Sequence, residues 1–374
     1  MNASEPPFVE VSHDAELAQW CERLAGTAVL ALDTEFIRVR TYHPQPALLQ
    51  LSDGRHHLLI DPLTLSRWQP LADCLTDPQQ LKVFHAAGED LEVCRRLFDA
   101  VPRPLFDTQV AAAFVGLGFS IGYQRLVEQL LGVTLEKGES RSDWLNRPLT
   151  PSQKHYAAQD VIHLHALHQW LHQRLQQRGH LRWFELEMER TLQEAERPIL
   201  PQERYLHLRA AQPLSSAELA IARSLAAWRE VEAIRRDLPR GFVLPDRALL
   251  DLVRRAPNDL SGLSGIAELH PSVIRHHGQT LLQLIAAART EPADQQPPPL
   301  STQLDAGQKA RLQRLKEQVR GRAQQLDIAV ELLASSRELS DWVVSSSDAG
   351  AAQPPRRLLE GWRFEAIGDL LTTE

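Results

Sequence analysis

A short apolar run at residues 28–32 leads directly into the acidic triplet Asp33-Thr34-Glu35. The run is too short for a typical helix and follows Gly26, so it predicts a buried β-strand. Side chains alternate along a strand, and Asp33 and Glu35 should therefore point to the same face. Two carboxylates held side by side repel each other, which raises the pKa of one of them unless a cation lies between them.

Two more acidic segments follow in the first half of the chain. One runs from His85 to Asp90, and the other is Tyr156-Ala157-Ala158-Gln159-Asp160. Tyr156 and Asp160 lie four residues apart in an expected helix and therefore share a face. Together with the first triplet, these segments outline a site whose ligands are carboxylates. Hard oxygen ligands without a nearby thiol favour magnesium or manganese over zinc.

Each segment taken alone also has an ordinary structural explanation. The triplet could be a solvated strand end, Asp90 a carboxylate favoured by a helix dipole, and Tyr156 a core tyrosine. The order and spacing of all three segments favour a catalytic site over these explanations. His85 is interpreted as a packed or hydrogen-bonded residue and not as a metal ligand.

Length and composition limit the class of protein. The chain has 374 residues, which predicts two or three domains. No apolar run approaches the roughly 20 residues needed to cross a bilayer, and the polar start does not resemble a signal peptide. We therefore expect a cytoplasmic protein without a membrane segment. The three cysteines are widely spaced among apolar neighbours, which indicates reduced thiols and no disulfide or zinc framework.

The first 200 residues mix strand and helix signals. Turn residues at 52–54 predict a hairpin, and later strands alternate with helices, so we expect an α/β domain with a mixed sheet. Asp107 should cap a helix, and Thr150-Pro151-Ser152-Gln153 should start one helix that runs to about Gln177. The predicted strands are 28–32, 47–51, 56–60, 81–84 and 104–106.

The remainder of the chain is helical in pattern. Ser215-Ser216-Ala217-Glu218 is a helix start signal, residues 198–201 predict a linker, and a stretch rich in proline and glutamine at 291–300 separates two helical modules. Residues 1–200 carry 19 basic and 26 acidic side chains, whereas 204–291 carry 12 basic and 9 acidic ones. The latter segment is the better candidate for contact with phosphate groups.

These motifs resemble those of the ribonuclease D family within the DEDD exonuclease superfamily, over essentially the whole chain. Residues 142–149 also look like that family, residues 239–246 are similar to the middle of an HRDC domain, and the last 75 or so residues match a second such domain loosely. Five positions fit the acidic motifs of the superfamily, with a tyrosine where other branches carry histidine: Asp33, Glu35, Asp90, Tyr156 and Asp160.

The resemblance implies a fold and an activity. It implies a ribonuclease-H-like mixed β-sheet exonuclease domain at residues 1–200, followed by two all-helical HRDC-type domains at 213–291 and 300–374. The four carboxylates would bind two divalent metal ions, Mg²⁺ or Mn²⁺, and Tyr156 would orient the attacking water. The implied enzyme is a 3′ to 5′ exoribonuclease that trims 3′ extensions of structured RNA, such as tRNA precursors, and releases nucleoside monophosphates.

Four residues near the acidic motifs are candidates for contact with the substrate, and two other functions are compatible with the sequence. Phe36 could stack on a terminal base or simply pack beside the strand. Arg38, Arg40 and Arg141 could meet the RNA backbone or be solvated surface residues. A DNA exonuclease of the proofreading kind uses the same carboxylate chemistry, and a non-catalytic RNA-binding protein could retain the fold. RNA is the predicted partner, and the sequence points to no particular protein partner.

Overall fold

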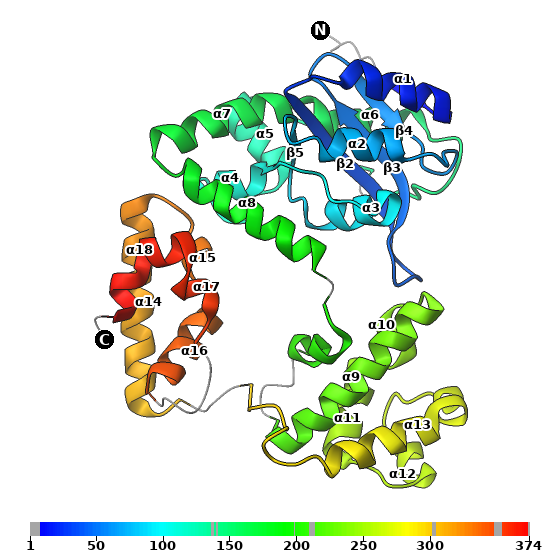
Figure 1. Ribbon diagram of the computed structural model, residues 1–374, viewed down its shortest axis with the longest axis vertical. Helices are drawn as coiled ribbons and strands as arrows, with labels where there is room; N and C mark the ends of the chain where they lie inside the picture. The colour runs from blue at the N-terminus through cyan, green and yellow to red at the C-terminus, as the bar shows by residue number, and fades with distance from the viewer. Residues whose placement is uncertain are drawn as a thin grey trace.

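The computed structural model describes residues 8–135, 138–139, 141–197, 199–208, 214–300, 304–347 and 354–372. The polypeptide forms an α/β unit followed by two groups of helices (Figure 1). Across these described ranges, no helix is both long enough and apolar enough to cross a membrane.

In the residues that the structure describes, the α/β unit is built on a six-stranded mixed sheet in the order β1-β4-β3-β2-β5-β6. Strand β2 is central, antiparallel to β3 and parallel to β5. Strand β4 pairs antiparallel with β3, and the outer strands β1 and β6 are parallel to their neighbours. This is the mixed sheet that the sequence predicted. The strands are β1 (Val9–Val11), β2 (Val29–Ile37), β3 (Gln45–Ser52), β4 (His57–Ile60), β5 (Leu81–Phe84) and β6 (Leu105–Asp107).

Five strands lie where the sequence predicted them, with small shifts at their ends. Strand β2 continues past the apolar run to Ile37, so the acidic triplet lies inside the strand and not after it. Strand β1 was missed, because three residues with two exposed side chains carry almost no hydrophobic pattern.

Within the described part of the α/β unit, eight helices accompany the sheet. Asp107 caps α4 as predicted, because its carboxylate accepts hydrogen bonds from the backbone N–H groups of Gln109 and Val110. The helices are α1 (Asp14–Leu24), α2 (Gln69–Thr76), α3 (Gly88–Phe98), α4 (Thr108–Phe114), α5 (Tyr123–Leu131), α6 (Pro151–Ile162), α7 (Leu164–Gln177) and α8 (Leu181–Glu196).

The expectation of one helix from Pro151 to about Gln177 was wrong. The capping box of Thr150 and Gln153 is present, but the segment divides at His163 into α6 and α7. Helix α6 packs on β2, β3 and β4, whereas α7 packs on β2, β5 and α4. Each half is thus placed by a different part of the sheet, and the helical periodicity alone does not reveal that change of direction.

The last group of helices shares its hydrophobic core with the α/β unit. Buried side chains of both regions form one continuous cluster, and α8 contacts α18 (Figure 1). At this contact the buried guanidinium of Arg363 donates two hydrogen bonds to Glu187, at 2.6 and 2.8 Å. The helices are α14 (Ala306–Leu326), α15 (Val330–Leu333), α16 (Ser336–Ser347), α17 (Arg356–Leu359) and α18 (Gly361–Thr372).

The middle group of helices has a hydrophobic core of its own. Ser215 and Glu218 form the expected capping box at its first long helix. The predicted domain boundaries remain predictions, and Pro198 and Pro213 lie outside the described residues. The elements are the 3₁₀ helix η1 (Pro201–His207), α9 (Ser216–Arg236), α10 (Arg240–Val243), α11 (Asp246–Arg255), α12 (Leu260–Ser264) and α13 (Pro271–Arg289).

The middle group contacts the α/β unit through the loop that joins β2 to β3. The backbone N–H groups of Tyr42 and His43 donate to Asp237 Oδ1 at 3.0 and 3.1 Å, and the Tyr42 hydroxyl hydrogen-bonds Glu230. The strand that carries Asp33 and Glu35 therefore continues directly into a contact with the middle helices.

Candidate active site

Three carboxylates converge beside the central strand. Asp33, Glu35 and Asp160 each offer one oxygen, and these three oxygens lie within 4.8 Å of one another. Asp33 and Glu35 occupy alternate positions of β2, while Asp160 lies on α6, which packs against that strand. The structure thus brings together acids that are separated by more than a hundred residues in the sequence.

Asp90 is joined to this group through Thr34. Asp90 lies in the first turn of α3 and is 7% exposed, and its Oδ1 accepts a 2.5 Å hydrogen bond from Thr34 Oγ1. Its oxygens are not part of the three-oxygen group, but its charge raises the pKa values of Asp33, Glu35 and Asp160. Asp90 therefore belongs to the same electrostatic site.

Burial is the largest cause of raised pKa values in all four acids. The pKa of Glu35 rises to about 9, those of Asp90 and Asp160 rise to about 7, and that of Asp33 lies well above its ordinary range. Among the described residues, no lysine or arginine forms an ion pair with these carboxylates. A divalent cation would supply the missing positive charge, and the all-oxygen donor set fits such an ion.

Tyr156 faces the same acids from α6, one helical turn before Asp160. Burial, followed by the charges of Asp160, Glu35 and Asp33, raises the pKa of Tyr156 well above its ordinary value. The phenol therefore remains protonated at neutral pH. It can hold a water molecule or a substrate oxygen by a hydrogen bond, but it is a poor proton acceptor.

Comparison with known proteins identifies the family. Residues 8–176 match a 3′-5′ exonuclease family model, and residues 218–285 match the HRDC domain model. The chain is 39% identical to a ribonuclease D from Pseudomonas paraeruginosa, over 99% of this chain and 98% of that protein. This chain belongs to the ribonuclease D family. It is also 37% identical to the Escherichia coli ribonuclease D, over 96% of each sequence.

Solved structures of related proteins have the same fold. The crystal structure of Escherichia coli RNase D, described as an exoribonuclease involved in structured RNA processing, superimposes with a TM-score of 0.89 and 36% identity over 98% of both chains. A protein from Bifidobacterium adolescentis, at 22% identity, matches with a TM-score of 0.68 and supports the fold alone. The ribonuclease-H-like exonuclease domain with a helical HRDC region is thereby confirmed.

The ribonuclease D-like segment at residues 142–149 has a structural role next to the site. Trp144 is fully buried against Ala47 and Leu48 of β3, and its ring lies 6.1 Å from that of Tyr156. Arg147 donates to both carboxylate oxygens of Asp61, at 2.6 and 2.8 Å, and to the Ala47 carbonyl. The segment thus supports β3 and the helix that carries Tyr156.

The buried aspartate Asp107, predicted only as a helix cap, also shapes the turn before Asp90. Asp107 accepts hydrogen bonds from the N–H groups of Ala86 and Ala87, at 3.0 and 2.9 Å. Ala86 has a φ of 61°, so this turn needs such support. His85 is hydrogen-bonded to Thr108 and to the Ile121 carbonyl, which matches its interpretation as a packed residue.

The predicted substrate-contacting residues have different environments. Phe36 is half-buried at a point where the pairing of β2 with β3 shifts register. Arg38 forms an ion pair with Glu92 and donates to the Tyr42 carbonyl, so the fold itself occupies this side chain. Arg40 and Arg141 are exposed and form no hydrogen bond with the described residues. Contact of these four residues with RNA remains a prediction.

Proposed function

We propose that this member of the ribonuclease D family hydrolyses the 3′-terminal phosphodiester of structured RNA with two divalent cations, held by Asp33, Glu35, Asp90 and Asp160. The 3′ to 5′ exoribonuclease activity itself follows from the family. The observation that supports this use of metal is the convergence of three carboxylate oxygens within 4.8 Å, in a half-buried site without a basic partner among the described residues.

The protein groups have distinct roles in this proposal. Two divalent cations can activate a water molecule and stabilise the leaving oxygen during in-line displacement. Asp33, Glu35 and Asp160 supply cation ligands, and Thr34 holds the carboxylate of Asp90 in place. Tyr156 positions the attacking water while it remains protonated, because burial and the neighbouring carboxylates raise the pKa of its phenol.

The substrate is RNA with an unpaired 3′ extension, such as a tRNA precursor, and the products are nucleoside monophosphates. The related Escherichia coli enzyme is described as acting in structured RNA processing, which supports this substrate class. Mg²⁺ and Mn²⁺ both suit an all-carboxylate ligand set. The cytoplasmic location remains a prediction.

The test is incubation of an end-labelled RNA hairpin carrying a 3′ extension with the protein and Mg²⁺, Mn²⁺ or a chelator. We expect stepwise shortening from the 3′ end, release of monophosphates and no cleavage with the chelator. A DNA oligonucleotide of the same sequence is the matched control and should be cleaved more slowly. Internal fragments, or cleavage that survives the chelator, would contradict the proposal.

A further inference from the structure

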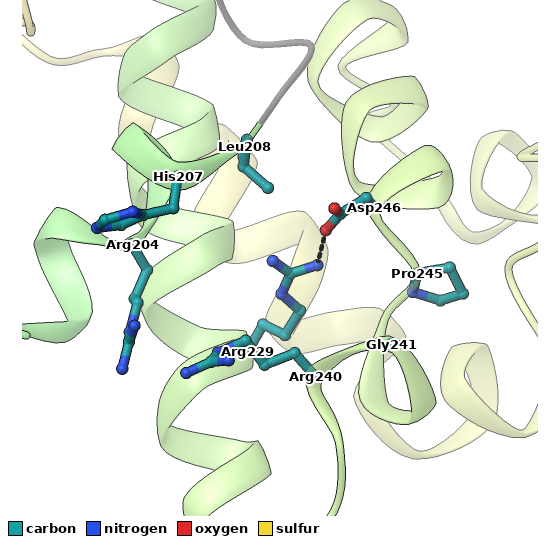
Figure 2. Close-up of a pocket in the computed structure, with 8 residues that line it drawn as sticks. All are labelled: Arg204, His207, Leu208, Arg229, Arg240, Gly241, Pro245 and Asp246. Atoms are coloured by element: carbon teal, nitrogen blue, oxygen red, sulfur yellow. Dashed lines mark hydrogen bonds and ion pairs between the residues drawn. The ribbon is translucent and has the colours of Figure 1, made fainter. Parts of the chain in front are cut away.

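A cavity of about 450 Å³ lies in the middle group of helices (Figure 2), and its lining includes none of the carboxylates of the candidate active site. The arginines that line it come from three elements: Arg204 from η1, Arg229 from α9 and Arg240 from α10. Figure 2 shows these side chains around a shared space, with Asp246 on one side. The cavity therefore presents several guanidinium groups to whatever occupies it.

Arg229 has hydrogen-bonding capacity that the described protein leaves unused. Its side chain is buried, with 4% exposure, and Nη1 donates to the Leu244 carbonyl at 3.0 Å and to Asp246 at 2.6 Å. Its Nε is buried without a hydrogen-bond partner, as is the Nε of Arg204. Both Nε atoms are covered by protein, so an occupant of the cavity would meet the Nη groups of these arginines.

The charges around the cavity do not cancel. Arg204 and Arg240 share a single buried carboxylate, Glu230, and Arg229 pairs with Asp246. Three guanidinium groups thus face two carboxylates. A guanidinium carries five N–H donors in a planar fork that matches phosphate oxygens. A phosphate group is therefore the ligand chemistry that suits this cavity.

The cavity is linked to the active site by one short loop. The Tyr42 hydroxyl lies 3.2 Å from Arg204 and 3.1 Å from Arg240, and the Arg240 guanidinium lies over the Tyr42 ring. Tyr42 follows Glu35 by seven residues, so their Cα atoms are at most about 25 Å apart. A strand of a few nucleotides can span such a distance.

We infer that this cavity binds a backbone phosphate of the RNA substrate, upstream of the bond that is cleaved at the carboxylates. The inference rests on the proposed function, because it assumes that RNA enters the carboxylate site. Free inorganic phosphate has the same chemistry and is the alternative source of the bound group.

Gly241 offers a way to change the charge of the cavity without removing any of its contacts. It lines the cavity, a Cβ built there meets no atom within 4 Å, and its φ lies outside the left-handed region. Gly241→Glu adds a negative charge, and Gly241→Gln is the neutral control of the same size. Neither variant removes an arginine or a carboxylate of the cavity.

The experiment measures binding of an RNA hairpin with a 3′ tail to the full-length protein in chelator, over a range of salt concentrations. We expect Gly241→Glu to weaken binding about three- to tenfold and to reduce the salt slope by about 0.7, the loss of one single-strand phosphate contact. Gly241→Gln should bind within about twofold of the parent protein. Hydrolysis of a dinucleotide, which is too short to reach the cavity, should be unchanged in both variants.

Three outcomes decide between the possibilities. Equal RNA affinities of the Glu and Gln variants would overturn the inference. If titration with inorganic phosphate detects binding that only Gly241→Glu abolishes, while RNA affinity is unchanged, the cavity binds free phosphate and the assignment to RNA fails. If the parent protein cleaves neither RNA nor the dinucleotide, the proposed function fails. The RNA affinities of the Glu and Gln variants then still show whether the cavity binds an RNA phosphate.

Discussion

Thr34 Oγ1 donates a 2.5 Å hydrogen bond to Asp90 Oδ1 and thereby joins two acidic motifs that lie 56 residues apart in the sequence. Both side chains are buried. The middle residue of the first motif is therefore a positioning residue: it orients a carboxylate that the proposed mechanism uses. Asp33 and Glu35, one residue to either side, point to the other face of β2.

Replacing Thr34 by valine should lower kcat for RNA by about tenfold or more, because a hydrogen bond to a charged group contributes roughly 1.5–3 kcal/mol. The metal concentration for half-maximal rate should rise as well. Thr34→Ser retains the hydroxyl and is the matched control. A valine variant with the metal titration and kcat of the parent protein would exclude this role.

The metal-free protein should lose stability as pH rises. The pKa values of Asp90 and Asp160 are about 7 and that of Glu35 is about 9, all above the unfolded values near 4. Between pH 4 and these raised pKa values, the folded state therefore binds more protons than the unfolded state. Stability from this source is present below pH 4 and falls by up to about 1.4 kcal/mol per pH unit for each proton.

Bound Mg²⁺ should reverse this trend, because it favours the ionised carboxylates. Thermal unfolding in chelator and in Mg²⁺ across pH 5–9 measures the effect. Stabilisation by Mg²⁺ should be greater at pH 9 than at pH 5. Identical pH profiles with and without the ion would show that the acids do not bind it.

Asp160→Asn should lower the cleavage rate by at least about a thousandfold and change RNA affinity only a few-fold, since the carboxylate acts on the metal and not on the base. In chelator the variant should be as stable as the parent protein or more stable, because one of the repelling charges is gone. Calorimetry with Mg²⁺ supplies a readout independent of cleavage. Parent-like stabilisation by Mg²⁺ in the variant would argue against Asp160 as a ligand.

Tyr156→Phe should reduce kcat by about ten- to a hundredfold and leave the shape of the pH–rate profile between pH 6 and 9 unchanged. Burial raises the pKa of the phenol above its ordinary value, so it does not titrate in that range and acts by position and not as a base. Initial rates at saturating RNA and metal check this. If the cleavage rate of the parent protein changed toward high pH and this change were absent from the Phe variant, the positioning role of Tyr156 would be contradicted.

Arg363→Met should destabilise the protein by roughly 3–5 kcal/mol, because it leaves Glu187 buried with its strongest partner removed. Hydrogen bonds from Arg363 and Arg190 outweigh burial and lower the pKa of Glu187 to about 2. The stability that this pair contributes is present above pH 4.5 and is lost as pH falls toward 2.

Burial lowers the pKa of Arg363, but arginine starts so high that the side chain stays charged at neutral pH. The double variant Arg363→Met with Glu187→Leu should recover part of the lost stability, since neither buried charge is then left without its counterpart. Chemical denaturation of the two single variants, Arg363→Met and Glu187→Leu, and of the double variant gives a double-mutant cycle. If the losses in free energy of unfolding of the two single variants added up to that of the double variant, the two residues would not interact.

Much of the fold was predictable because its signals are local. The apolar run before Asp33, the capping box of Thr150 and Gln153, and the capping box of Ser215 and Glu218 each specify a nearby piece of backbone. Strand β1 and the division at His163 were not predictable. The first pairs with a distant strand, and the second arises from packing on different parts of the sheet.

The sequence by itself determined which chemical groups are available and how close neighbours are directed. Asp33 and Glu35 share a face because strands repeat every two residues, and Tyr156 and Asp160 share one because helices repeat every 3.6. Only the tertiary structure decided that Thr34 holds Asp90, that Glu187 meets Arg363, and that three arginines surround one cavity. Those contacts join segments far apart in the chain, and local periodicity carries no information about which distant residues meet.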